Sequence, residues 1–100
     1  MKIAFTWDYE MFFGHKSGSV NRCMIEPTSR LLEISQRYDS KFTFYVDSGM
    51  LAKGKECKSF TSDFNQLSAQ IKKWDSIGHE TGLHIHPHWE DATWNEGWQF

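Results

Sequence analysis

Three histidines stand at alternate positions in the stretch GHETGLHIHPHW, residues 78–89, and this stretch has the clearest potential for chemistry in the chain. They are His84, His86 and His88. Neutral imidazole is the commonest protein ligand for Zn²⁺ and related ions, and a hydrophobic core does not need so many imidazoles within five residues. We therefore expect a metal site here, completed by a carboxylate from elsewhere in the chain.

The carboxylate is expected from the segment FTWDYE near the N-terminus, which contains Asp8 and Glu10. Residues 2–7 are short, apolar and rich in Ile, Phe and Trp, which predicts a strand buried on both faces. Asp8 then follows the end of the strand, where α/β folds place their chemistry. We expect the two stretches to meet at the carboxyl ends of neighbouring parallel strands.

Spacing alone leaves the choice of ligands open. An extended strand would put His84 and His86 on one face, but Pro87 breaks the extended run and leaves His88 as an alternative. Asp8 and Glu10 also share a side if the chain stays extended there. His79 and Glu80 are interpreted as structural, with His79 a hydrogen-bonded core histidine at a helix-to-strand junction.

Two helical segments must bring these stretches together. Pro27 suits a first helical turn, and the pattern that follows predicts a helix over residues 27–38. The spacing of Phe64, Leu67, Ile71 and Trp74 predicts a second helix, with Thr61 or Ser62 as its N-cap and Gly78 just past its end.

The strands between and after these helices complete a βαβαβ order. Residues 41–46, KFTFYV, alternate and are aromatic, so they predict a second strand that Asp47 ends. Residues 79–86 predict a third. Residues 50–60 give no clear pattern, and the tail after His88 is expected to be a loop or another helix. The order βαβαβ implies an α/β fold with a parallel sheet and right-handed crossovers.

Composition excludes several classes of protein. An apolar content of 39% argues against disorder, and a net charge of −2 without a basic run argues against nucleic-acid binding. The N-terminus lacks the long apolar stretch of a signal peptide, and nothing approaches a membrane span. We therefore expect a cytoplasmic protein in which Cys23 and Cys57 are free thiols.

Three motifs also carry a family resemblance. They are TWDYE at residues 6–10, TFYVD at 43–47, and GHETGLH at 78–84 continuing to His88. In order and spacing they resemble T-F-D-D-G, T-F-F-V and G-H-E-I-G-N-H-T-x-x-H of the polysaccharide deacetylase (NodB homology) family, carbohydrate esterase family 4. The third motif is the specific one, and the resemblance covers essentially the whole chain.

The resemblance implies that residues 1–100 are the N-terminal half of a distorted (β/α) barrel of the polysaccharide deacetylase type. Full (β/α) barrels have about 250 residues, and the family's later motifs are absent from this sequence. They include an Arg-Pro segment, an Asp-Trp segment and a Leu-x-His with a catalytic histidine. We therefore expect either a missing C-terminal half or association into a homo-oligomer.

For the site, the resemblance implies a divalent metal ion, usually zinc, bound by His84 and His88. Asp8 matches the family's general base, but Tyr9 stands where its metal-binding aspartate should be. Three explanations remain open: Glu10 replaces that ligand, Asp8 binds the metal with Glu10 as base, or activity has been lost. Trp89 and Phe13 are candidates for stacking on a sugar ring, with core packing as the alternative for a tryptophan.

The implied activity is metal-dependent hydrolysis of N- or O-acetyl groups on a sugar or polysaccharide precursor. The general acid of the family is the late histidine, so this segment alone is expected to be inactive on a sugar amide. His15 could reach the site, although a solvated loop histidine is the simpler expectation. The alternatives are another metal-dependent amide hydrolase on the same scaffold, or an inactive domain that binds sugar or a partner.

Overall fold

The computed structural model describes residues 1–12 and 18–100. Its main sheet has three parallel strands in the order β1-β2-β3, namely β1 (Thr6–Tyr9), β2 (Thr43–Asp47) and β3 (Glu80–His84). Helix α1 (Glu26–Arg37) lies between β1 and β2 in the chain, and helix α3 (Thr61–Ser76) precedes β3. The predicted parallel α/β order is confirmed, and over the described residues the sheet stays open rather than closing into a barrel.

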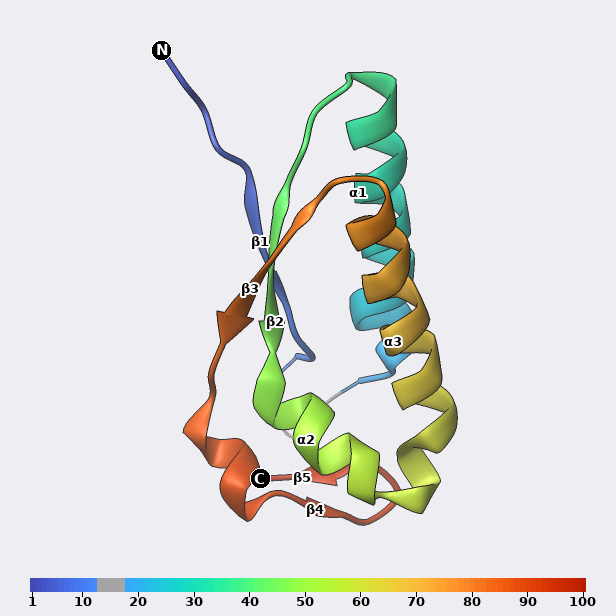
Figure 1. Ribbon diagram of the computed structural model, residues 1–100. Coiled ribbons are helices and arrows are strands. Elements are labelled where there is room, and N and C mark those ends of the chain that lie inside the picture. The colour runs from blue at the N-terminus through green and yellow to red at the C-terminus, as the bar shows by residue number, and fades with distance from the viewer. Residues whose placement is uncertain (13–17) are drawn as a thin grey trace.

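Both long helices cover the same face of the sheet (Figure 1). That face bears Tyr9 and Phe44, both buried. The opposite face bears a row formed by Asp8, Tyr45 and Gly82, which are paired in register across the strands. This alternation follows from the period of two in an extended strand, and it leaves polar side chains on the face without helices.

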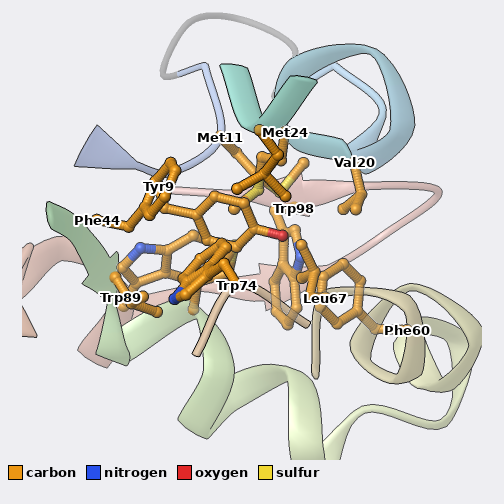
Figure 2. Close-up of a cluster of buried hydrophobic side chains, with 14 of the residues drawn as sticks. Tyr9, Met11, Val20, Met24, Phe44, Phe60, Leu67, Trp74, Trp89 and Trp98 are labelled. Carbon is orange, nitrogen blue, oxygen red and sulfur yellow. The ribbon is translucent and has the colours of Figure 1, made fainter. Parts of the chain in front are cut away.

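The core between sheet and helices is aromatic (Figure 2). Trp74 of α3 stacks on Phe44 with ring centroids 4.3 Å apart, and Tyr9 meets Trp74 edge-on at 4.7 Å. The Tyr9 hydroxyl donates a hydrogen bond to Gln70 Oε1 at 2.7 Å, and burial raises the Tyr9 pKa. These contacts fix β1 against α3 and set the face to which each β1 side chain points.

Helix α3 has the predicted apolar stripe, in which Leu67 and Trp74 are fully buried. The predicted capping role of Thr61 or Ser62 is wrong, because α3 continues from a 3₁₀ turn, η2 (Lys58–Phe60), and its N-cap is Phe60 without a side-chain hydrogen bond. Gly78 follows the helix at φ +95°, a left-handed conformation that favours glycine. The predicted helix end is therefore confirmed.

Strand β1 begins later than predicted. The sequence favoured residues 2–7, but pairing with β2 starts at Thr6 opposite Thr43, and Ile3 is exposed. Asp8 therefore lies inside the strand rather than after it. Helix α1 matches its predicted range within one residue at each end and is preceded by a π-helical turn, η1 (Asn21–Ile25).

Helix α2 and the elements of the C-terminal tail were not predicted, and they lie near the carboxyl ends of the strands (Figure 1). Helix α2 (Ser48–Glu56) begins directly after β2. The tail forms a 3₁₀ turn, η3 (Pro87–Asp91), and an antiparallel ribbon of β4 (Thr93–Trp94) and β5 (Trp98–Gln99). The sequence predicted a loop or another helix there; the segment begins as a 3₁₀ helix, and the β-ribbon that follows was not expected. Trp89 and Trp98 of this segment are buried in the core.

Two smaller predictions concern the cysteines and the membrane. Cys23 and Cys57 are not joined in a disulfide, as predicted. Across residues 1–12 and 18–100, the longest helices are too short or too polar to traverse a lipid bilayer.

Candidate metal centre

Glu10, His84 and His86 converge on one point at the carboxyl end of the sheet. The Nε2 atoms of His84 and His86 lie 2.8 Å and 2.5 Å from the same oxygen, Oε2 of Glu10. All three side chains are about one-quarter exposed, at 26–28%. Within the described ranges this is the one group of three His, Cys, Asp or Glu side chains whose ligand atoms all lie within 4.8 Å of one another.

Strand geometry explains this convergence. Tyr9 points into the helix-side core, so the next residue, Glu10, faces the opposite side of the sheet. His86 remains extended, at φ −120° and ψ 108°, so it shares a face with His84. Leu83 and Ile85 alternate with the histidines and are exposed on the other face.

The donor set suits a divalent metal ion. Two imidazole nitrogens and one carboxylate oxygen are a common ligand set for catalytic zinc, in which three protein ligands leave a position for water or substrate. The partial exposure of the group keeps that position accessible. The residues present therefore fit the ion that the sequence predicts, with Glu10 rather than Asp8 as the carboxylate in contact with the histidines.

His88 lies outside this group. Pro87 begins η3 and turns the chain, and the His88 ring packs edge-on against Phe100 with centroids 4.6 Å apart. The structure thus brings together His84 and His86, the pair that strand periodicity favours. The pair of His84 and His88 that the family resemblance implies is not assembled.

Asp8 and Tyr9 occupy opposite faces of β1. Asp8 is exposed on the face that Glu10 shares and is not a member of the three-residue group. Tyr9 is buried, and its hydroxyl is bonded to Gln70. Tyr9 therefore does not stand in for the metal-binding aspartate of the resembled motif, whereas Glu10, one residue later, reaches the histidines.

The two candidate sugar-stacking residues have different outcomes. Trp89 is only 1% exposed, so its ring belongs to the core and does not offer a face to a sugar. The alternative of core packing therefore applies to Trp89. Phe13 lies outside the described residues, as does His15.

A hollow of about 600 Å³ runs between β1 and α1 and reaches the metal group at Glu10. Its lining includes Trp7, Asp8, Arg22 and Leu31. Small-molecule sites commonly have volumes of about 300–1,000 Å³ and combine apolar walls with a few polar groups. The hollow therefore offers space for a substrate beside both candidate carboxylates.

Comparison of the chain with known protein families, curated proteins and solved structures finds no match. The likeness to polysaccharide deacetylases therefore depends on the three sequence motifs. Because a fold alone does not specify a function, the functional argument must come from the geometry of the site.

His79 is the core histidine that the sequence predicts. It is 4% exposed, and the Phe42 backbone N–H donates to its Nδ1 at 2.9 Å. That bond leaves the ring proton on Nε2, which lies 3.2 Å from the Ser35 hydroxyl oxygen and donates to it. Burial, and then the positive charge of Lys41, lower the His79 pKa, so His79 acts as a neutral structural group.

Asp47 is the residue whose role the sequence analysis missed. It is fully buried beside His84 in the sheet register, and its carboxylate accepts hydrogen bonds from the Met50 N–H and from Trp89 Nε1. Burial raises the Asp47 pKa, while these hydrogen bonds and the charge of His86 oppose the rise. The missed signal was local: an aspartate ending a strand before a new segment is a typical helix N-cap.

Proposed function

We propose that Glu10, His84 and His86 bind a divalent metal ion, with zinc as the first candidate. We further propose that the protein is a metal-dependent hydrolase that removes N- or O-acetyl groups from a carbohydrate. The observation that carries the proposal is the contact of both histidine Nε2 atoms with one Glu10 oxygen. The resemblance of three motifs to polysaccharide deacetylases supports the choice of reaction.

The arrangement of the sheet supports the proposed architecture. Three parallel strands in sequence order, with both crossover helices on one face, are what the first half of a (β/α) barrel would contain. We propose that the chain is the N-terminal half of such a barrel, so that its helix-free face belongs to the barrel interior. Active sites of these barrels lie at the carboxyl ends of the strands, which is where the metal group lies.

In the proposed mechanism, Glu10, His84 and His86 would hold the ion at the carboxyl end of the sheet. A bound divalent ion would polarise an acyl carbonyl and lower the pKa of bound water toward ~7. Asp8 is exposed on the same side of β1 as Glu10 and accepts the proton of the attacking water. The hollow beside Asp8 and Glu10 receives the sugar.

The proposal assigns no residue of 1–12 and 18–100 to the protonation of the leaving amine. These 100 residues are therefore expected to bind metal without measurable deacetylation of a sugar amide. Deacetylation by the isolated chain would show that one of its own residues serves as the general acid.

The alternative of an inactive binding domain gains its support from Tyr9, which replaces an aspartate of the resembled motif. That alternative leaves no reason for Glu10 to face the histidines. Instead, the Glu10 carboxylate contacts both of them, which favours a metal site in which the carboxylate has shifted by one residue.

The test is the metal content of the protein purified without added metal, followed by titration with Zn²⁺. We expect one equivalent in the parent, and its loss in Glu10→Ala, His84→Ala and His86→Ala. His88→Ala and Asp8→Asn are the matched controls and should retain it. Loss of metal in His88→Ala with retention in His86→Ala would replace this group by the pair that the resemblance implies, and no binding by the parent would refute the metal site.

A further inference from the structure

The corner between β2 and α2 is formed by Asp47, Ser48 and Gly49. It contacts residues 84–89, here called the histidine segment, at both ends. The first contact is at His84. Ser48 donates a hydrogen bond from its hydroxyl to the His84 carbonyl oxygen at 3.2 Å. Asp47 and His84 are the last residue pair of the parallel ladder between β2 and β3. The Ser48 bond lies just beyond this pair, so it adds one more contact that fixes the backbone of His84.

The second contact is at Trp89, three residues after His86. Trp89 donates a hydrogen bond from Nε1 to Asp47 Oδ2 at 2.5 Å, and both residues are buried, with 1% and 0% of their surfaces exposed. A hydrogen bond to a carboxylate is stronger than one between neutral groups, and burial shields it from competing water. The indole is thus fixed to the start of α2.

The third contact is steric and concerns Gly49. A Cβ atom at this position would lie 2.7 Å from Trp89 Cβ and 3.0 Å from two atoms of the indole ring. Gly49 lies in the first turn of α2 with an ordinary helical backbone, so the helix itself does not require glycine. Close approach of Trp89 is the reason a side chain does not fit there.

We infer that this corner positions the metal ligands, with Ser48 holding the segment before His86 and the contacts to Trp89 holding it after. The inference rests on the proposed metal site and adds to it three positioning residues that do not touch the ion. Groups that orient ligands in this way typically change metal affinity by about 10–100-fold when lost. The contacts also explain why a tryptophan follows the histidines: it anchors the segment and does not bind sugar.

If the corner had a purely structural role, its variants would affect metal affinity no more than similar substitutions elsewhere in the chain. Two such control positions are available. Trp74 is also fully buried and donates from Nε1 to Thr81 Oγ1 at 2.9 Å, within the helix-side core. Ser76 donates from its hydroxyl to the Lys73 carbonyl oxygen at 2.6 Å, on the surface of α3. Each control loses a hydrogen bond from the same donor group, an indole or a serine hydroxyl, at a position that does not contact the metal group.

The main experiment compares Trp89→Phe with Trp74→Phe in titrations with Co²⁺, whose absorption reports both affinity and ligand geometry. We expect Trp89→Phe to weaken Co²⁺ binding by about 10-fold with a changed spectrum, and Trp74→Phe to stay within about 2-fold. The stability of each variant is measured by urea denaturation so that unfolding is not mistaken for weaker binding. Equal effects of the two substitutions on affinity, or none from Trp89→Phe, would overturn the inference.

Ser48→Ala provides a milder variant that keeps the core intact, with Ser76→Ala as its control. We expect Ser48→Ala to weaken Co²⁺ binding by about 3-fold or more, against no change in the control. Gly49→Ala should raise the helix propensity of α2 and still weaken binding, because the added methyl group displaces Trp89. Unchanged affinity in both corner variants would contradict the positioning role.

A readout without metal separates this inference from the proposed function. The imidazole ¹⁵N chemical shifts of His84 and His86 report their hydrogen bonds to Glu10 in the metal-free protein. These shifts should change in Trp89→Phe and stay constant in Trp74→Phe. If the parent binds no metal, the proposed function fails, while changed shifts would still support the positioning of the histidines and constant shifts would refute it.

Discussion

His79 and the pair His84 and His86 lie within one short stretch of sequence, yet the structure gives them opposite environments. Both ring nitrogens of His79 are engaged by its core neighbours, Phe42 and Ser35. The Nε2 atoms of the pair meet a carboxylate on a partly open surface. The same side-chain type thus serves as a structural bridge at one end of β3 and as a candidate ligand at the other.

The difference shows that a histidine's role depends on whether it lies at the amino end or the carboxyl end of β3. His79 precedes β3 at its amino end, where Ser35 of α1 and the start of β2 enclose the ring. His84 and His86 lie at and beyond the carboxyl end, where the chains of a parallel α/β sheet diverge and leave room for ligands. A histidine count alone would treat the three residues as equivalent.

The largest expected effect is on Zn²⁺ affinity, when the same substitution to alanine is made once in each of the two environments. His84→Ala should weaken Zn²⁺ binding by about 1,000-fold, or about 4 kcal/mol, with little change in stability because the residue is partly exposed. His79→Ala should leave Zn²⁺ affinity within about 3-fold. Calorimetric titration of both variants checks this, and a similar loss of affinity in His79→Ala would show that the two environments are coupled.

The second prediction concerns the stability that His79 provides. His79→Ala should lower the free energy of unfolding by about 2–4 kcal/mol, because it leaves the buried Phe42 N–H without its acceptor and opens a cavity. Ser35→Ala removes only one end of the bridge and should cost about 1 kcal/mol. Urea denaturation measures both values. Equal costs would mean that the bond to Phe42 contributes little.

Local sequence patterns predicted part of the fold and of the site, and the features that they missed depend on long-range contacts. The stripe of Leu67 and Trp74 is a local pattern, so it predicted α3. The period of two would put His84 and His86 on one face of an extended strand, but Pro87 left His88 as an alternative. Helix α2 was hidden because its glycines, Gly49 and Gly54, resemble loop residues. Gly49 is explained by a long-range contact with Trp89, which no local pattern contains.

The carboxylate of the site shows the same limit. Sequence spacing left Asp8 and Glu10 as alternatives, because both residues share one face of an extended strand. The register places Asp8 level with Gly82, two residues before His84, whereas Glu10 contacts both histidines. That choice required the sheet register, which is a property of two strands together.

The third prediction uses pH to distinguish His79 from the other ionisable groups. Its folded pKa is lowered from 6.5, so as pH falls through about 6.5 the unfolded chain binds a proton that the folded protein resists. Stability should therefore decline below that pH, by at most about 1.4 kcal/mol per pH unit for one proton, until the folded pKa is reached.

Urea denaturation at several pH values, in the parent and in His79→Ala, isolates this contribution as the difference between the two curves. The comparison is needed because burial raises the pKa values of Asp47 and Asp63, and raised carboxyl pKa values favour the folded state as pH falls. A difference between parent and variant that is independent of pH from 7.5 to 5.5 would contradict the assignment of His79 as a neutral core group.

The smallest expected effect concerns Lys41, whose charge acts on His79 although its hydrogen bond is made elsewhere. Its Nζ donates a hydrogen bond to the Ile77 carbonyl oxygen at 2.7 Å, and its charge is the second cause of the lowered His79 pKa after burial. Lys41→Met should raise the His79 pKa and cost less than about 1 kcal/mol of stability. A ¹H NMR titration of the His79 ring in the parent and in the variant measures the shift. Because burial remains in the variant, the His79 pKa should stay below that of a free histidine. A return to the free value would mean that the charge of Lys41, and not burial, keeps this histidine neutral.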